Sequence, residues 1–197
     1  MELIFIRHGH GEHLLDYPNR LDVPHPGLTG YGVQQIIQLR DQFPLFIDDI
    51  IIVSPTKRTF QTAQLLTRNH KFYVSSYVGP RMFPQSPQSP TSNFYKCDRI
   101  YTKEEMEEHY RELSILDFGL NEWGEGINRI DQNLFEAYGM ELLEWCHAKG
   151  KRTIIVSHDG TITNYRKLLG EKGLTRQDFL GEAGVYKTEF ASRSEMK

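Results

Sequence analysis

Cysteine is scarce in this chain of 197 residues, which carries only Cys97 and Cys146. Two thiols so far apart in the sequence match no zinc-ligand spacing, and they cannot form the disulfide framework of a small secreted domain. We therefore expect a protein that works in a reducing compartment, the cytoplasm.

Long apolar runs and an excess of basic residues are also missing. No stretch of about 18 apolar residues occurs, so we expect no membrane span. The first residues enter a strand-like run without a basic leader, which predicts that there is no signal peptide. A net charge of -3 argues against a general nucleic-acid binder. It leaves room for a small, locally basic pocket.

Four short apolar runs rich in β-branched residues are present, at residues 3–6, 50–53, 72–77 and 153–156. Continuous apolar runs of this length are typical of strands that are covered on both faces in a parallel sheet. Helical patterns lie between them. This alternation predicts one α/β domain over residues 1–197 with a mostly parallel sheet.

Three of the helical patterns carry start or stop signals. Thr29 is a candidate N-cap, and Ser54-Pro55 reads as an N-cap followed by proline at the first helical position. A third helix is predicted to end at Gly150. Its apolar stripe consists of Leu134, Tyr138, Leu142 and Trp145.

Residues 79–127 interrupt this alternation with several prolines and the acidic, helix-like stretch TKEEMEEHY. We interpret this region as an insertion that lies over the edge or the mouth of the sheet, as lids and binding loops do. Three of its cations, Arg81, Arg99 and Lys103, are candidates for binding a second anionic group of a ligand.

Charged and imidazole side chains follow three of the predicted strands at the point where each ends. Arg7 and His8 follow the first strand, Arg58 lies shortly after the second, and His158 and Asp159 follow the strand at 153–156. Ligands of open α/β sheets bind outside the carboxyl ends of the strands. We therefore expect these side chains to meet at one edge of the sheet.

Two arginines and two histidines at one edge repel one another unless an anion lies among them. Arginine has a planar fork that matches phosphate oxygens, and helix N-termini add amide donors. A neutral imidazole is a competent nucleophile near pH 7. The cluster therefore predicts a phosphate pocket in which one histidine attacks phosphorus and the other binds its oxygens.

The same residues carry a family resemblance. The motifs are Arg7-His8-Gly9, Leu28-Thr29-Gly30, Ser54-Pro55 with Arg58-Thr59, and Val156-Ser157-His158-Asp159-Gly160. In this order they resemble the histidine phosphatase superfamily, whose phosphoglycerate mutase-like fold is a three-layer α/β/α sandwich. The resemblance implies that His8 becomes phosphohistidine, and that Arg7, Arg58 and His158 bind the phosphoryl oxygens. It implies no metal and no organic cofactor.

The sequence departs from that family at the proton donor. Many members carry a glutamate after the third strand, where this chain has Pro84 or Gln85. Another acid must then protonate the leaving oxygen. Asp159 is our first candidate, because it resembles the His-Asp pair of the acid-phosphatase branch, although aspartate is also a favoured N-cap. Glu125 and Glu12 are the second and third candidates.

The predicted function is therefore a phosphomonoesterase that acts through His8 on a small phosphorylated molecule, as a monomer or homodimer. A phosphoglycerate mutase is an alternative within the same fold. The missing glutamate also motivates a regulatory protein that binds inorganic phosphate or a phosphorylated ligand and turns it over poorly.

Overall fold

The computed structural model describes the chain except for residues 69, 86–94, 111–112, 120–122 and 193–197. Its described residues form one six-stranded sheet with the order β4-β3-β2-β5-β1-β6. The strands are β1 (Glu2–Arg7), β2 (Ile50–Val53), β3 (Tyr73–Val74), β4 (Ser114–Ile115), β5 (Thr153–Ser157) and β6 (Val185–Glu189). All neighbours are parallel except β6, which pairs antiparallel with β1.

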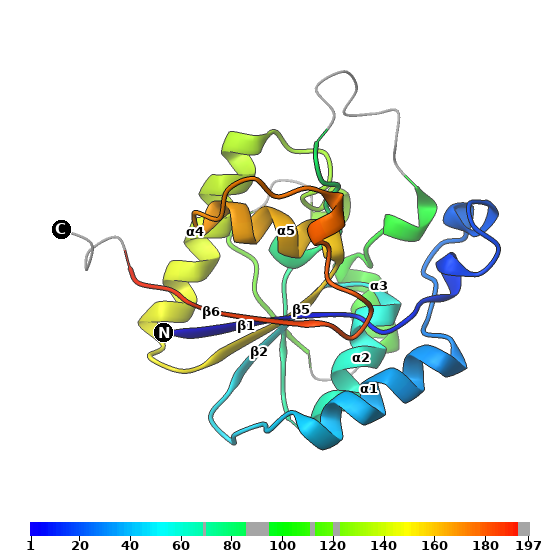
Figure 1. Ribbon diagram of the computed structural model, residues 1–197, viewed down its shortest axis with the longest axis horizontal. Helices are drawn as coiled ribbons and strands as arrows, with labels where there is room; N and C mark the ends of the chain where they lie inside the picture. The colour runs from blue at the N-terminus through cyan, green and yellow to red at the C-terminus, as the bar shows by residue number, and fades with distance from the viewer. Residues whose placement is uncertain (69, 86–94, 111–112, 120–122, 193–197) are drawn as a thin grey trace.

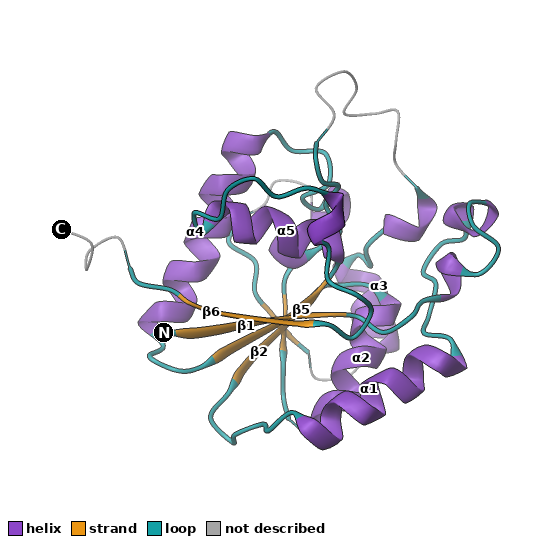
Figure 2. Ribbon diagram, viewed as in Figure 1, coloured by secondary structure: helices purple, strands orange, loops and turns teal. Residues whose placement is uncertain are grey.

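Helices cover both faces of the sheet. They are α1 (Gly30–Gln42), α2 (Lys57–Thr67), α3 (Lys103–His109), α4 (Gln132–Ala148) and α5 (Asp159–Leu168). The helices α4 and α5 lie on one face, and α1 and α2 lie on the other (Figures 1 and 2). The predicted α/β architecture with a mostly parallel sheet between two helical layers is confirmed.

The central strands are as apolar and as buried as their sequences predict. Every residue of β2 and β5 is buried, as are the four central residues of β1. The run at 72–77 is only partly a strand, because β3 ends at Val74 and a short 3₁₀ helix, Ser76–Val78, follows. Strands β4 and β6 were not predicted; both are short or half-exposed, so they lack a continuous apolar signal.

The helix starts are predicted with mixed success. Thr29 caps α1 by accepting a hydrogen bond from the Gly32 backbone, as expected. The prediction that Ser54-Pro55 opens the second helix is wrong, because α2 begins at Lys57 after Thr56. The Ser54 hydroxyl is not available for capping, since it lies 2.8 Å from His158 Nε2.

The apolar stripe of α4 is shifted by one residue from the predicted one. Leu134 is 38% exposed, whereas Phe135 is fully buried. Leu142 faces the core as predicted. Gly150 lies just after the helix with a φ of 63°, which agrees with its predicted role as the stop.

The segment at 79–127 does more than cover the sheet, because it supplies the edge strand β4. It also supplies α3, which the acidic stretch predicted. Thr102 and Glu105 form a capping box at the start of α3. A short 3₁₀ helix, Lys96–Asp98, precedes them.

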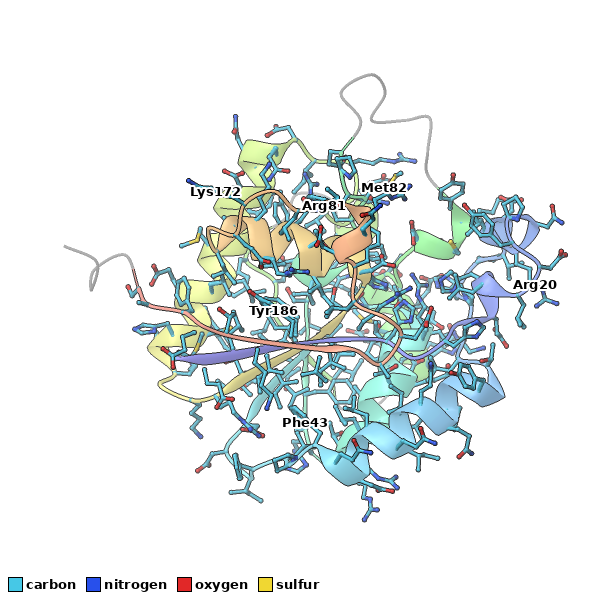
Figure 3. The ribbon with its side chains drawn as sticks, in the orientation of Figure 1. Arg20, Phe43, Arg81, Met82, Lys172 and Tyr186 are labelled. Carbon is cyan, nitrogen blue, oxygen red and sulfur yellow. The ribbon has the colours of Figure 1, made fainter. Side chains whose placement is uncertain are left out.

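The three cations predicted to bind a second anion all have partners within the protein. Arg81 is buried and donates to the carbonyls of Ile127 and Ile130 (Figure 3). Arg99 pairs with Glu105 at 2.6 Å, and Lys103 pairs with Asp117. These hydrogen bonds tie the segment after β3 to the segment between β4 and α4, and Arg81 also lies on the wall of a cavity of about 360 Å³.

The sheet order brings three strand ends together. β5 lies between β2 and β1, and the registers pair Arg7 with Ser157 and Val53 with Val156. The residues that follow these strands therefore emerge side by side, with His158 between the other two.

The loop after β1 packs closely against the first turn of α1. A Cβ atom at Gly32 would lie 2.2 Å from the His10 carbonyl oxygen. We expect Gly32→Ala to lower the free energy of unfolding by about 1–3 kcal/mol, because backbone atoms must move apart. Gly30→Ala in the same turn is the control, since nothing lies within 4 Å of its Cβ position. Urea denaturation compares them, and equal stability of the two variants would contradict this packing.

Candidate active site

His8 lies directly after β1 and is only 3% exposed. Its Nδ1 lies 2.7 Å from the Gly9 carbonyl oxygen, which can only accept, so Nδ1 carries the proton. Its Nε2 accepts a hydrogen bond of 3.2 Å from Arg58 Nε. The lone pair of Nε2 is thus directed toward the guanidinium of Arg58.

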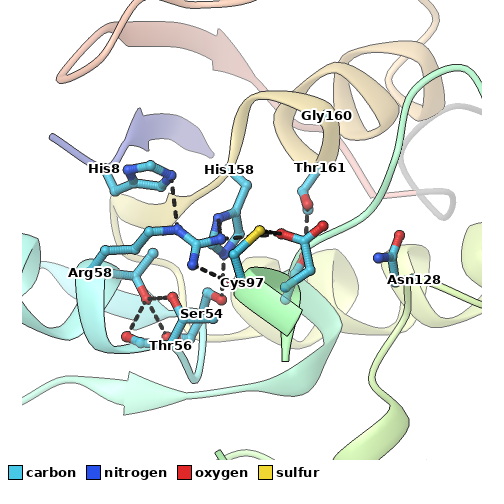
Figure 4. A network of polar contacts seen from close by, with 12 residues as sticks. His8, Ser54, Thr56, Arg58, Cys97, Asn128, His158, Gly160 and Thr161 are labelled. Carbon is cyan, nitrogen blue, oxygen red and sulfur yellow. Dashed lines mark hydrogen bonds and ion pairs between the residues drawn. The ribbon is translucent and has the colours of Figure 1, made fainter. Parts of the chain in front are cut away.

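His158 lies after β5, and its ring centroid is 5.2 Å from that of His8. Its Nδ1 lies 3.1 Å from Arg58 Nη2 and accepts from it. In the neutral ring the proton is then on Nε2, which donates to the Ser54 hydroxyl at 2.8 Å. The two predicted histidines therefore meet, and Arg58 bridges them (Figure 4).

Arg58 comes from the first turn of α2 and is 2% exposed. Besides the two histidines, its guanidinium contacts the insertion. Nη1 donates to the Cys97 carbonyl at 2.7 Å, and Nη2 lies 3.3 Å from the Asp98 carboxylate. All three of its nitrogens thus have partners in the protein.

Arg7 pairs with Asp159, the first of the three acids predicted from the sequence. Its Nη2 forms an ion pair of 3.0 Å with Asp159, and its Nη1 donates to the Leu180 carbonyl. Asp159 also accepts a hydrogen bond of 2.6 Å from the Gly160 backbone at the start of α5. Arg7 Nε is buried and has no hydrogen-bond partner among the described residues.

The imidazoles of this site are neutral near pH 7. Burial first, and then the charge of Arg58, lower the pKa of His8 and of His158 well below the usual value. The same causes lower the pKa of His13 to about 3. His13 is buried, with its ring centroid 5.7 Å from that of His8.

Two carboxylates balance the two arginines of the site. Asp98 forms an ion pair with Arg58, and Asp159 forms an ion pair with Arg7. From the sequence, an external anion is expected to relieve the repulsion between these cations. The protein instead places one internal carboxylate against each of them, which lowers the net charge of the site.

A cavity of about 360 Å³ opens beside these groups. His158, Asp159 and Asp98 lie on its wall, together with His13 and the Arg176 side chain. The rest of the lining is Arg81 and a set of largely apolar or aromatic residues: Tyr17, Leu21, Pro80, Met82, Phe83, Tyr95, Cys97, Gly160 and Phe179.

The structure thus gathers His8, Arg7, Arg58, His158 and Asp159, but neither of the two remaining acid candidates lines the cavity. Glu12 accepts a hydrogen bond from the Gly27 backbone, and Glu125 pairs with Arg129 at 3.0 Å while half-exposed.

Sequence reasoning missed Asp98 and His13. His13 had a signal, its proximity to the Arg-His-Gly motif. Asp98 had none, because it lies in an irregular stretch.

The buried histidines predict a pH-dependent stability. Their pKa values are lower in the folded protein than the value of about 6.5 in the unfolded chain, so the unfolded chain binds protons first as the pH falls. We expect the free energy of unfolding to fall below about pH 6.5, by about 1.4 kcal/mol per pH unit for each such group.

His13→Asn tests this linkage, since it removes one of these groups. Urea denaturation between about pH 7 and pH 5.5 should give a shallower slope for the variant, by about 0.6 proton on average. All other titrating groups, Asp98 included, are common to the two proteins and cancel. Identical slopes would show that His13 is not a buried neutral imidazole.

The described residues contain no helix with the length and hydropathy needed to cross a bilayer. Within the same residues, no three His, Cys, Asp or Glu side chains gather in a way that could hold a metal ion.

Comparisons with known proteins bear on the family and on the fold. The model of the histidine phosphatase superfamily (branch 1) matches residues 3–80, which include His8 and Arg58. No curated protein matches the chain by sequence.

Solved structures share the fold over nearly the whole chain. Alpha-ribazole phosphatase from Shigella flexneri has a TM-score of 0.59 at 18% identity, covering 97% of this chain and 91% of that one. Phosphoserine phosphatase from Entamoeba histolytica, in complex with 3-phosphoglyceric acid, has a TM-score of 0.56 at 20% identity, covering 94% and 89%. Phosphoglycerate mutase from Thermus thermophilus has a TM-score of 0.53 at 17% identity, covering 98% and 95%. The match at residues 3–80 and the phosphoglycerate mutase-like fold of these structures together support the resemblance of the chain to the histidine phosphatase superfamily.

Proposed function

We propose that the protein hydrolyses small phosphate monoesters through a phosphohistidine on His8. The observation that carries the proposal is the contact of one buried arginine, Arg58, with both His8 and His158 at adjacent strand ends. This arrangement joins a nucleophile, a planar cation and a second imidazole at the edge where α/β sheets bind ligands.

His8 has the protonation state that a nucleophile needs. Its Nδ1–H is held by the Gly9 carbonyl, and its Nε2 carries the lone pair. Because burial lowers the pKa of His8, the ring stays neutral in mildly acidic solution as well as at pH 7. The attacking atom is therefore Nε2.

Arg58, Arg7 and His158 bind the phosphoryl oxygens in this proposal. Phosphate oxygens replace the Asp98 carboxylate as partners of Arg58, and Arg7 Nε offers a buried donor that has no partner among the described residues. A bound dianion also raises the pKa of His158, so that the ring can take up a proton and donate to the phosphate.

The reaction has two steps. Nε2 of His8 bonds to phosphorus as the ester oxygen leaves with a proton, and water then cleaves the P–N bond to give inorganic phosphate. No metal and no organic cofactor takes part in this scheme. Two carboxyl groups on the cavity wall are placed to supply the proton: Asp159, which the sequence indicates, and Asp98.

The cavity supports a small substrate. A volume of about 360 Å³ lies within the range of small-molecule sites, and its lining suits an ester with an apolar or aromatic organic group. The structural relatives named for alpha-ribazole phosphatase and phosphoserine phosphatase activity are consistent with a small phosphorylated metabolite. The buried free thiols of Cys97 and Cys146 support our proposal of a cytoplasmic protein.

A second function, binding of phosphorylated ligands without efficient turnover, is favoured by one observation. Both arginines are already paired with carboxylates, Arg58 with Asp98 and Arg7 with Asp159. A ligand must compete with these internal anions.

Turnover of an aryl phosphate distinguishes the two functions. The wild-type protein is incubated with nitrophenyl phosphate at mildly acidic pH, with and without EDTA, and is quenched in alkali to trap label from a ³²P ester. We expect phosphate release that EDTA does not change and an alkali-stable, acid-labile label. No release and no label, with vanadate still raising the Tm, would establish the binding protein instead.

A further inference from the structure

The leaving oxygen needs a proton, and the acid that the superfamily usually provides after the third strand is missing here. In its place, Gln85 donates its amide N–H to the carbonyls of Met82 and Asn128. An amide that is held in this way has no acidic proton to give. The donor must be another group on the cavity wall.

Asp159 is poorly suited to that task because both of its oxygens are already engaged by N–H donors of the protein. Oδ2 forms an ion pair of 3.0 Å with Arg7, and Oδ1 accepts a hydrogen bond of 2.6 Å from the Gly160 backbone. Both oxygens thus serve as acceptors for fixed N–H donors. We interpret Asp159 as a residue that orients Arg7 at the start of α5.

Asp98 has a different environment. Its side chain is about one-fifth exposed, with 21% of its area accessible, and it lines the cavity beside His158. Its polar partners are Arg58 Nη2 at 3.3 Å and the Cys97 thiol at 3.9 Å. Burial raises the pKa of Asp98, with Arg58 acting against that shift. Once phosphate oxygens take over Arg58, the carboxylate loses its counterion and the protonated form is favoured further.

Arg58 also fixes where this carboxyl lies relative to the nucleophile. Its Nε contacts His8 Nε2, and its Nη2 contacts Asp98. A phosphoryl group held by this guanidinium would therefore have His8 near one end of it and Asp98 near the other. In-line displacement needs the attacking and the leaving atoms on opposite sides of phosphorus.

Resting on the proposed function, we propose that Asp98 is the general acid–base residue that replaces the missing glutamate. In the first step, the Asp98 carboxyl proton passes to the ester oxygen as the P–O bond breaks and the His8 Nε2–P bond forms, so the alcohol leaves neutral. In the second step, the Asp98 carboxylate takes a proton from the attacking water as the P–N bond breaks. The cycle returns both side chains to their starting states.

Two esters with different leaving groups test this role. Nitrophenolate leaves without a proton, whereas phenolate from phenyl phosphate leaves poorly without one. We expect Asp98→Asn to lower kcat/KM for phenyl phosphate by about 10²–10⁴-fold and to change kcat/KM for nitrophenyl phosphate by less than about tenfold. The matched variant Asp159→Asn should lower both by the same factor. Asp98→Glu, which keeps an acidic proton, should restore part of the rate with phenyl phosphate.

The ratio of kcat/KM for phenyl phosphate to kcat/KM for nitrophenyl phosphate tests the role of Asp98, because this ratio does not depend on how much of a variant is folded. An unchanged ratio in Asp98→Asn would reduce Asp98 to a counterion of Arg58 and overturn the proposal. A changed ratio in Asp159→Asn alone would assign the proton to Asp159 and overturn it as well. If the wild type hydrolyses neither ester, the proposed function itself fails, which is a separate result.

Discussion

We expect His8→Ala to lower kcat for nitrophenyl phosphate by at least about 10⁴-fold, the scale on which enzymes respond when a covalent nucleophile is removed. The physical reason is that the variant lacks the Nε2 atom that forms the P–N bond in the proposed reaction, whereas Nε2 of the neighbouring His158 donates its proton to Ser54. We also expect that no ³²P label can be trapped on the His8→Ala protein. Quenched-flow trapping and steady-state assays measure the two effects.

Phosphate binding should survive in the same variant, because Arg7, Arg58 and His158 remain. We expect vanadate or phosphate to raise the Tm of His8→Ala as it does for the wild type.

His10→Ala is the matched control for His8→Ala, since His10 lies on the same loop and its ring nitrogen Nδ1 contacts Thr29 Oγ1, whereas His8 contacts Arg58. It should keep the wild-type rate within a few-fold. A label that persists in His8→Ala would move the nucleophile to another residue.

The strand ends were predictable because they depend on local signals. An apolar run that stops at a charged residue marks both a buried strand and its exit, and parallel pairing brings the exits of neighbouring strands to one edge. That reasoning placed His8, Arg58 and His158 in one site, and the contacts between their side chains agree with it. The strand order, with β5 between β2 and β1, then decides that these side chains touch.

Capping residues were less predictable, because local and tertiary bonds compete for the same hydroxyl. Ser54 has the sequence context of an N-cap, yet its hydroxyl lies against His158, a residue 104 positions away. Thr29 meets no such competition and caps α1 as its context indicates. A side chain near a binding site is thus a weaker cap signal than the same side chain elsewhere.

The counterions of the site were beyond prediction from a single sequence. Asp159 is next to His158, so its presence at the site was expected, but its pairing with Arg7 depends on how β1 and β5 align. Asp98 reaches Arg58 only through the path of an irregular insertion, for which hydrophobic periodicity gives no signal. The consequence is that the acid chemistry of this protein has to be read from its tertiary contacts.

Arg58→Met should cost both activity and stability, and the two losses have separate causes. We expect kcat/KM for nitrophenyl phosphate to fall by at least about 10³-fold, since the fork that would hold the phosphoryl oxygens is gone. Unfolding should become easier by about 3–5 kcal/mol, because the Asp98 carboxylate and the Cys97 carbonyl lose their buried partner. Steady-state kinetics and urea denaturation measure these losses.

The double variant Arg58→Met/Asp98→Asn separates the two causes. Asp98→Asn removes the carboxylate charge that Arg58→Met leaves unpaired. Part of the lost free energy of unfolding should therefore return, while kcat/KM stays low. Arg99→Met is the matched control on the same insertion: its pair with Glu105 is on the surface, where such a pair contributes at most about 1 kcal/mol, and it lies outside the cavity lining. If Arg58→Met kept the wild-type kcat/KM, the guanidinium at the centre of the site would only neutralise Asp98. Phosphate would then have to bind through Arg7 and His158 alone.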